Sequence, residues 1–180
     1  MTNAASSSGD LKMVTGLFKD SKSVDRAYDS VAKRGYGTGD INVVMSDDTR
    51  RRYFSDDRQI DTELVSKAAE GGELGGPIGG TIGTIMPALV AAGGLLAFPA
   101  LGLVLAGPVA VALAAAGAAG LAFGLIGALS DWGIPEERIQ QYEAGIHDGG
   151  VLMGVKARSD DDARHFEQQW NAIGGQYVHS

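Results

Sequence analysis

The sequence predicts an α+β fold: a ferredoxin-like split βαβ sandwich interrupted by a long apolar helical hairpin rich in glycine and alanine. Two observations lead to this prediction. The apolar periodicities of strands and helices alternate in both flanks of the chain. Between the flanks, residues 74–130 contain no Asp, Glu, Lys, Arg or His. The flanks are therefore expected to form one discontinuous αβ domain, and the charge-free stretch between them an insertion.

The first flank, residues 11–73, is expected to supply a strand, a helix and a second strand. Residues 12–18 and residues 41–45 are short apolar runs rich in β-branched side chains, as is typical of strands. The segment between them has one apolar face at helical spacing, and a serine at position 21 or 23 is expected to cap it. That face consists of Val24, Ala27, Tyr28, Val31 and Ala32.

The second flank, residues 131–180, is expected to add helix, strand, helix and strand. Pro135 and the two glutamates after it suit a first helical turn, because acidic side chains favour the positive end of the helix dipole. Residues 151–155 form an apolar run, and Ser159 before three aspartates indicates the start of a last helix. Residues 176–179 are expected to form the closing strand. Two such flanks can bury a core without the charge-free stretch.

The charge-free stretch, residues 74–130, is long enough for two helical passes through a bilayer, each of which needs about 20 residues. A hairpin turn is expected where proline and glycine lie close together, at Phe98, Pro99 and Gly102. Small residues recur at intervals of four on one helix face and predict close helix packing, as in a glycine zipper. These helix-packing residues are Gly75, Gly79, Gly83, Ala116, Gly120, Gly124 and Ala128.

Two environments remain open for this hairpin. Helices that are apolar all round are typical of membrane segments, whether the hairpin spans the bilayer or only enters it. The alternative is a soluble homo-oligomeric shell or filament in which the hairpins form a shared apolar core that holds lipid or another apolar ligand. Against this alternative, only Thr81, Thr84 and Ser130 provide polar side chains in the stretch. Both environments predict self-association.

Composition and motifs exclude several other classes of function. The net charge of −7 and the isoelectric point near 4.8 argue against nucleic acid as a partner, because phosphate binding requires a basic face. The chain has no cysteine and no glycine-rich phosphate-binding motif. Its histidines, His147, His165 and His179, are isolated in sequence. No catalytic residue, metal ligand or cofactor site is therefore predicted, and the protein is not expected to be an enzyme.

Two stretches of the flanks follow a recognisable pattern. One is Val14-Thr15-Gly16-Leu17-Phe18, and the other runs from Gly133-Ile134-Pro135-Glu136-Glu137 through Tyr142 to Gly149-Gly150-Val151-Leu152. In these residues the chain resembles bacterial general stress proteins of the heat-induced or low-temperature-induced type. The resemblance covers residues 11–155. It implies a small αβ domain joined to a glycine-rich apolar segment, with no catalytic residues.

The first ten residues are small and polar, which predicts a flexible tail and no secretory signal. The cytoplasm, or the cytoplasmic face of a bacterial membrane, is therefore the expected location. The expected function is that of a non-enzymatic, membrane-associated stress protein whose partners are membrane lipid and further copies of itself. Its apolar hairpin is expected to insert in lipid and to pack between copies.

Overall fold

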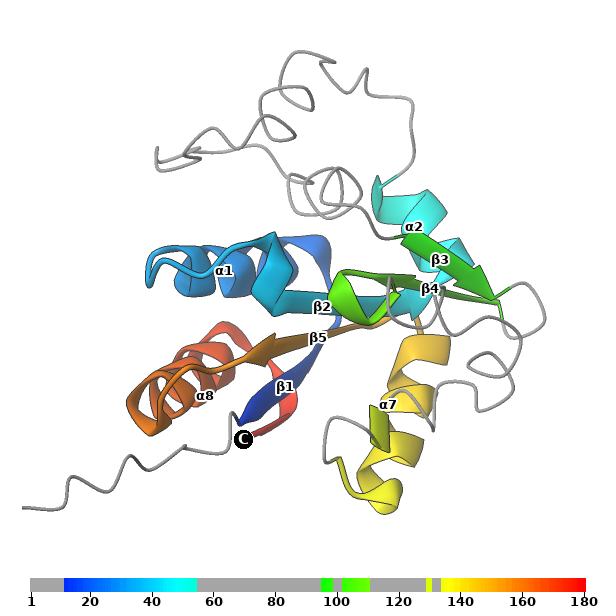
Figure 1. Cartoon of the computed structure of the whole chain (residues 1–180). Coiled ribbons are helices and arrows are strands. Elements are labelled where there is room, and N and C mark those ends of the chain that lie inside the picture. The colour runs from blue at the N-terminus through cyan, green and yellow to red at the C-terminus, as the bar shows by residue number, and fades with distance from the viewer. Residues whose placement is uncertain (1–11, 55–94, 99–101, 111–128, 131–133) are drawn as a thin grey trace, which may run out of the picture.

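The computed structural model of the protein describes residues 12–54, 95–98, 102–110, 129–130 and 134–180. These residues form an α+β fold with a six-stranded sheet, all of whose neighbouring strands are antiparallel (Figure 1). None of the described helices is long and apolar enough to cross a membrane. The α+β class predicted from the sequence is confirmed.

The strand order of the sheet is β3-β4-β2-β5-β1-β6. Because β5 lies between β1 and β2 and is antiparallel to both, β1 and β2 run in the same direction without touching. The strands are β1 (Met13–Phe18), β2 (Ile41–Ser46), β3 (Leu95–Phe98), β4 (Leu103–Ala106), β5 (Val151–Lys156) and β6 (Gln176–His179).

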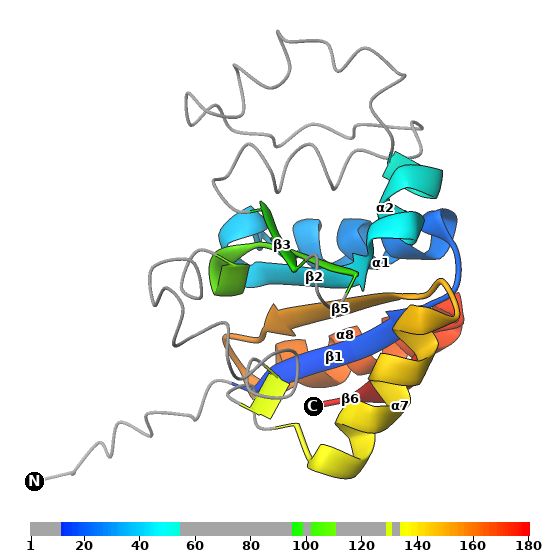
Figure 2. The same cartoon turned by 90° about the vertical axis from the view of Figure 1, so that its right-hand side faces the viewer.

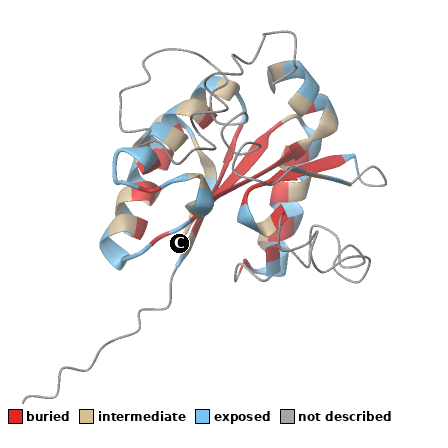
Figure 3. Ribbon diagram, turned by 45° about the horizontal axis from the view of Figure 1, so that its top comes forward, coloured by how far each residue is buried: buried red, intermediate tan, exposed pale blue. Residues whose placement is uncertain are grey.

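Helices cover both faces of this sheet (Figure 2). One face carries α1 (Ser21–Ala32) and α8 (Asp160–Ile173), and the opposite face carries α7 (Glu136–His147). A short 3-10 helix, η1 (Thr38–Asp40), precedes β2, and α2 (Asp47–Phe54) follows it. Since both faces are covered, β1, β2 and β5 are buried along almost their whole length, as Figure 3 shows.

The helix starts depend on short side chains that satisfy free backbone N–H groups. Ser159 caps α8 as predicted, because its hydroxyl accepts from the Asp162 N–H at 3.1 Å. The predicted serine cap of α1 is wrong. Asp20 caps that helix, and its carboxylate accepts from both the backbone N–H and the hydroxyl of Ser23 at 2.9 Å. An aspartate caps at least as well as a serine, so sequence alone did not separate the two positions.

The buried side chains form two clusters, one on each face of the sheet. On the face of α1 and α8 the largest members are Trp170, Phe18 and Phe166, and on the face of α7 they are Tyr142, Ile139 and Ile146. Glycine lets α7 lie close to β1, since a Cβ on Gly145 would overlap the side chain of Leu17. Of the apolar face predicted for α1, Val24, Ala27 and Val31 are buried and Tyr28 is half-buried, whereas Ala32 is exposed.

The charge-free stretch contributes β3 and β4 to the same sheet. β4 pairs with β2, with Leu105 opposite Val44, and β3 pairs with β4. The prediction of a helical hairpin is therefore wrong for residues 95–98 and 103–106. The edge of β2 away from β5 has backbone N–H and C=O groups that need hydrogen-bond partners. Pairing with β4 satisfies the backbone groups of both strands and buries Leu103 and Leu105 in the α7 cluster. The strand pairing and side-chain burial together stabilise the strand more than local propensity stabilises a helix.

Of the predicted turn residues, Phe98 is the last residue of β3, so its prediction as part of the turn is wrong, whereas Gly102 lies between the two strands. It has a φ of 62°, and its carbonyl accepts from the Asp47 N–H at 2.8 Å, which ties the turn to the start of α2. Pro99 lies outside the described residues, as do the predicted helix-packing residues. These are Gly75, Gly79, Gly83, Ala116, Gly120, Gly124 and Ala128.

Candidate functional site

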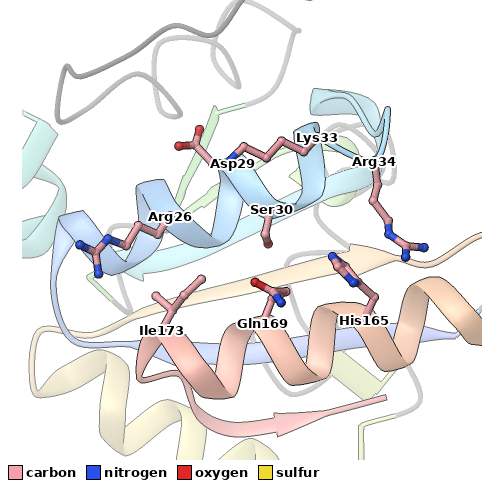
Figure 4. Close-up of a pocket in the computed structure, with 8 residues that line it drawn as sticks. All are labelled: Arg26, Asp29, Ser30, Lys33, Arg34, His165, Gln169 and Ile173. Carbon is pink, nitrogen blue, oxygen red and sulfur yellow. The ribbon is translucent and has the colours of Figure 1, made fainter.

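A groove of about 500 Å³ lies between α1 and α8 and opens to solvent (Figure 4). Figure 4 shows Ser30 of α1 and His165 and Gln169 of α8 pointing into the space between the helices. Its lining residues are Arg26, Asp29, Ser30, Lys33, Arg34, His165, Gln169 and Ile173. This groove is the candidate site in the described part of the chain.

The floor of the groove joins the two helices. The indole N–H of Trp170 donates to the Ala27 carbonyl at 3.3 Å and to the Ser30 hydroxyl at 3.2 Å. The Ser30 hydroxyl in turn donates to the Ala27 carbonyl at 2.7 Å. The Ser30 hydroxyl is therefore engaged in hydrogen bonds within the fold, and none of the hydrogen bonds of the described residues joins it to a base.

The charges of the groove nearly balance. Arg26 and Lys33 make no ion pair with any described residue, whereas Arg34 is bound to two aspartates of α8 and Asp29 adds a negative charge to the lining. His165 contacts Phe166 edge to face and makes no hydrogen bond within the described ranges. The described lining of the groove therefore shows no catalytic pair of side chains and no strong positive potential that would bind an anion. The groove is best described as a solvated depression of the surface.

A polar cluster around Tyr36 lies next to the start of α8. The Tyr36 hydroxyl donates to Asp162 at 2.6 Å and accepts from the Arg158 backbone N–H at 2.7 Å. The Arg158 guanidinium lies over the Tyr36 ring, 4.2 Å from its centroid, and pairs with Asp40 at 2.7 Å. Arg34 binds Asp162 from the other side. The cluster thus joins the connection after α1 to the first turn of α8.

The electrostatics of this cluster follow from its contacts. The hydrogen bond from Tyr36, followed by those from Arg34 and Ser159, holds the pKa of Asp162 below its ordinary value. Burial, together with the hydrogen bond to Asp162, raises the pKa of Tyr36. The folded state therefore favours an ionised Asp162 beside a neutral Tyr36. Each group is engaged with a partner, so the cluster stabilises the fold and offers no free acid or base.

The lowered pKa of Asp162 gives a pH-dependent prediction. Above about pH 5 the carboxylate is ionised in both states, and we expect Asp162→Asn to lower the free energy of unfolding by about 1 kcal/mol. Because the folded-state pKa is the lower one, this stabilisation is lost as the pH falls through it. The difference between wild type and variant should shrink below about pH 4 in urea titrations.

The matched control for this prediction is Asp160→Asn. Asp160 lies on the same helical turn, but its side chain is 72% exposed, and among the residues that the structure describes it pairs only with Lys12, at 3.3 Å. This variant should differ from wild type by no more than a few tenths of a kcal/mol. Equal losses in the two variants would show that the Tyr36 contact does not stabilise the fold.

A second polar group lies under the opposite face of the sheet. The Tyr142 hydroxyl is 2.9 Å from the Thr15 hydroxyl and donates to the Tyr177 carbonyl at 2.7 Å. Burial raises the pKa of Tyr142. Tyr177 itself is 49% exposed and has a φ of 53°, an uncommon value for tyrosine. These contacts position the end of β6.

From the sequence, the three aspartates after Ser159 indicated only a helix start, and the Tyr36 cluster was not predicted. Tyr36 and Asp162 are 126 residues apart, and a single tyrosine between two glycines was the only local signal. The three histidines lie on α7, α8 and β6. In the ranges that the structure describes, no group of three or more His, Asp or Glu side chains is arranged to hold a metal ion.

Comparison with known proteins adds no relative. No protein-family model matches the chain, and no curated protein or solved structure shows significant similarity to it.

Proposed function

We propose that this is a non-enzymatic, membrane-associated protein that assembles with itself, with parts of residues 74–130 entering lipid and packing between copies. The observation that carries this proposal is the absence of any ionisable side chain from residues 74–130. A stretch of this length without charge is typical of segments that enter a lipid bilayer. The resemblance to bacterial stress proteins supports a role at the envelope under stress.

The folded domain holds parts of the charge-free stretch. α2 precedes the charge-free stretch, β3 and β4 return it to the sheet, and Leu129 and Ile134 lie in the cluster under α7. The charge-free stretch is thus part of the folded domain at β3, at β4 and at Leu129. We further propose that the domain is ferredoxin-like: the order β2-β5-β1-β6, with α1 and α8 on one face, fits a split βαβ core.

One observation favours the alternative, a soluble shell or filament. β4 is buried inside the domain, so part of the charge-free stretch is covered by protein instead of lipid. If the remaining residues of the stretch behave in the same way, their apolar side chains form the shared interior of a soluble assembly. The two proposals predict different fractions in a cell lysate.

The experiment that separates them is detergent-free fractionation of expressing cells, followed by carbonate washing, sizing and phospholipid analysis. Membrane insertion predicts a pellet that resists carbonate and is released by detergent. A large lipid-free particle in the supernatant would establish the soluble assembly instead. A monomer in the supernatant would overturn both proposals.

A charge variant sharpens the fractionation. Leu113→Lys together with Leu121→Lys places two charges in the stretch, each costing about 3 kcal/mol at a bilayer centre, and should shift the protein from pellet to supernatant. Gln140→Lys and Gln141→Lys place the same charges on the exposed side of α7 and should leave the protein in the pellet. Circular dichroism of both variants checks that the domain remains folded. An unchanged pellet in the leucine variant would contradict lipid insertion.

A further inference from the structure

β3 is one edge of the sheet. In the part of the chain that the structure describes, it has a strand neighbour, β4, on one side only (Figure 1). Such a strand presents backbone N–H and C=O groups along its free side, and these pair readily with another strand. Ala97 is exposed and Leu96 is half-buried. The free side of β3 is thus suited to the addition of a further strand.

The two edges of the sheet differ in how they are protected. Proteins block an edge with charged side chains, proline, bulges or strong twist. β3, with the sequence Leu-Leu-Ala-Phe, has no charged side chain or proline within the strand, and its regular register with β4 shows no bulge. β6 contains glutamine and histidine, its register with β1 shifts, and Tyr177 has a φ of 53°. β6 is therefore a poor template for pairing, and β3 is a good one.

The charge distribution indicates which partner fits β3. Each chain has a net charge of −7, so two copies repel each other over most of their surface. β3 lies within the stretch that has no charge at all, where two copies can meet without placing like charges opposite one another. A charged partner would find no complementary group on this strand.

We infer that β3 is the contact through which two copies of this chain join, antiparallel and about a twofold axis, into one continuous sheet. Antiparallel pairing of identical strands gives each copy the same contacts, as a closed dimer requires. The inference rests on the proposed self-assembly, because a four-residue strand is too short to hold two free chains together. Packing of the charge-free stretch would supply the high local concentration that the pairing needs.

The absence of cysteine permits a direct test with single-cysteine variants of the full chain. In Ala97→Cys the thiol is on the proposed contact. Adjacent strands are about 4.8 Å apart and rise about 3.4 Å per residue, so the two Cα atoms would lie within about 10 Å of each other in any register that pairs most of the strand. The controls are Tyr177→Cys on the opposite edge and Gln141→Cys on the exposed side of α7.

The measurement is the rate of covalent dimer formation with a short bis-maleimide, made on whichever cell fraction contains the protein. Ala97→Cys should cross-link at least about tenfold faster than either control, since paired thiols react at a high effective concentration. Cross-linking that is equally fast at all three sites, or absent at Ala97, would overturn the inference. If another part of the same chain covers the β3 edge, no dimer forms at Ala97, and this result also overturns the inference.

The proposed function and the β3 contact are tested by different measurements, so either one can be excluded without the other. Fractionation reports whether the protein enters a membrane or a large particle, and the cross-linking rate reports only the contact at β3. A carbonate-resistant pellet without dimers at Ala97 would retain the proposed function and discard the contact. Specific dimers at Ala97 from a soluble protein that forms no larger particle would retain the contact and discard membrane insertion.

Discussion

Replacing Trp170 with alanine is expected to lower the free energy of unfolding by about 3–5 kcal/mol, the range for truncating a large buried aromatic side chain. Trp170 is fully buried, and its ring meets that of Phe18 edge to face, with centroids 5.6 Å apart. Gly16 makes room for the indole, because a Cβ there would lie 3.0 Å from it. Proteins are stabilised by only about 5–15 kcal/mol, so this loss is large.

The expected loss of stability is large because Trp170, a residue of α8, packs against both α1 and β1. The substitution removes the ring contact and both hydrogen bonds of the indole N–H to α1, and it leaves a cavity between the helices and the sheet. Trp170→Phe retains much of the ring and should cost less, about 1–2 kcal/mol. Urea unfolding followed by circular dichroism measures both variants. A loss below 1 kcal/mol for alanine would show that α8 does not depend on this contact.

Gly107→Ala is expected to cost about 3 kcal/mol, for two reasons that act together. Gly107 follows β4 with a φ of 112°, a conformation that side chains rarely adopt and that costs about 1–3 kcal/mol when imposed. A Cβ would also overlap the Ile41 carbonyl oxygen and lie 2.9 Å from the side-chain oxygen of Asn42. Both neighbours belong to β2, so the strand itself would have to move.

The same substitution also affects the connection after β4. The Asn42 side-chain oxygen accepts from the Val109 N–H at 2.9 Å, and Asn42 is almost fully buried. Displacing Asn42 would leave a buried polar group without its partner. Gly37→Ala is the matched control, because nothing lies within 4 Å of its Cβ position and its φ is −109°. Thermal unfolding should show a clear loss for Gly107→Ala and almost none for Gly37→Ala, and equal melting temperatures would contradict the prediction.

The sequence by itself determined the elements of the flanks. β1, α1, β2, α7, β5, α8 and β6 lie within about two residues of the positions that periodicity and capping predicted. These elements are local patterns: apolar positions recur every two or every three to four residues, and a capping residue such as Ser159 marks where a helix begins. Buried residues such as Trp170 and Tyr142 were predictable for the same reason.

The candidate groove and the polar cluster around Tyr36 were predictable only in part. The helices that carry them follow from the sequence, but no residue of the groove was predicted as a site, and the contact of Tyr36 with Asp162 joins segments 126 residues apart. Local patterns do not determine which distant hydroxyl meets which carboxylate. The packing of α1 against α8 on one face of the sheet decides that, and it makes Asp162 part of a structural cluster.

The tertiary structure alone decided the conformation of residues 95–98 and 103–106. A charge-free stretch of alanine, glycine, leucine and valine has no polar face, so its sequence shows no period that separates strand from helix. β2 had one side open in the sheet, and pairing there satisfies the backbone groups of β4 while it buries Leu103 and Leu105 on the α7 face and Val104 on the other. Where side-chain pattern gives no preference, the available backbone partner determines the structure.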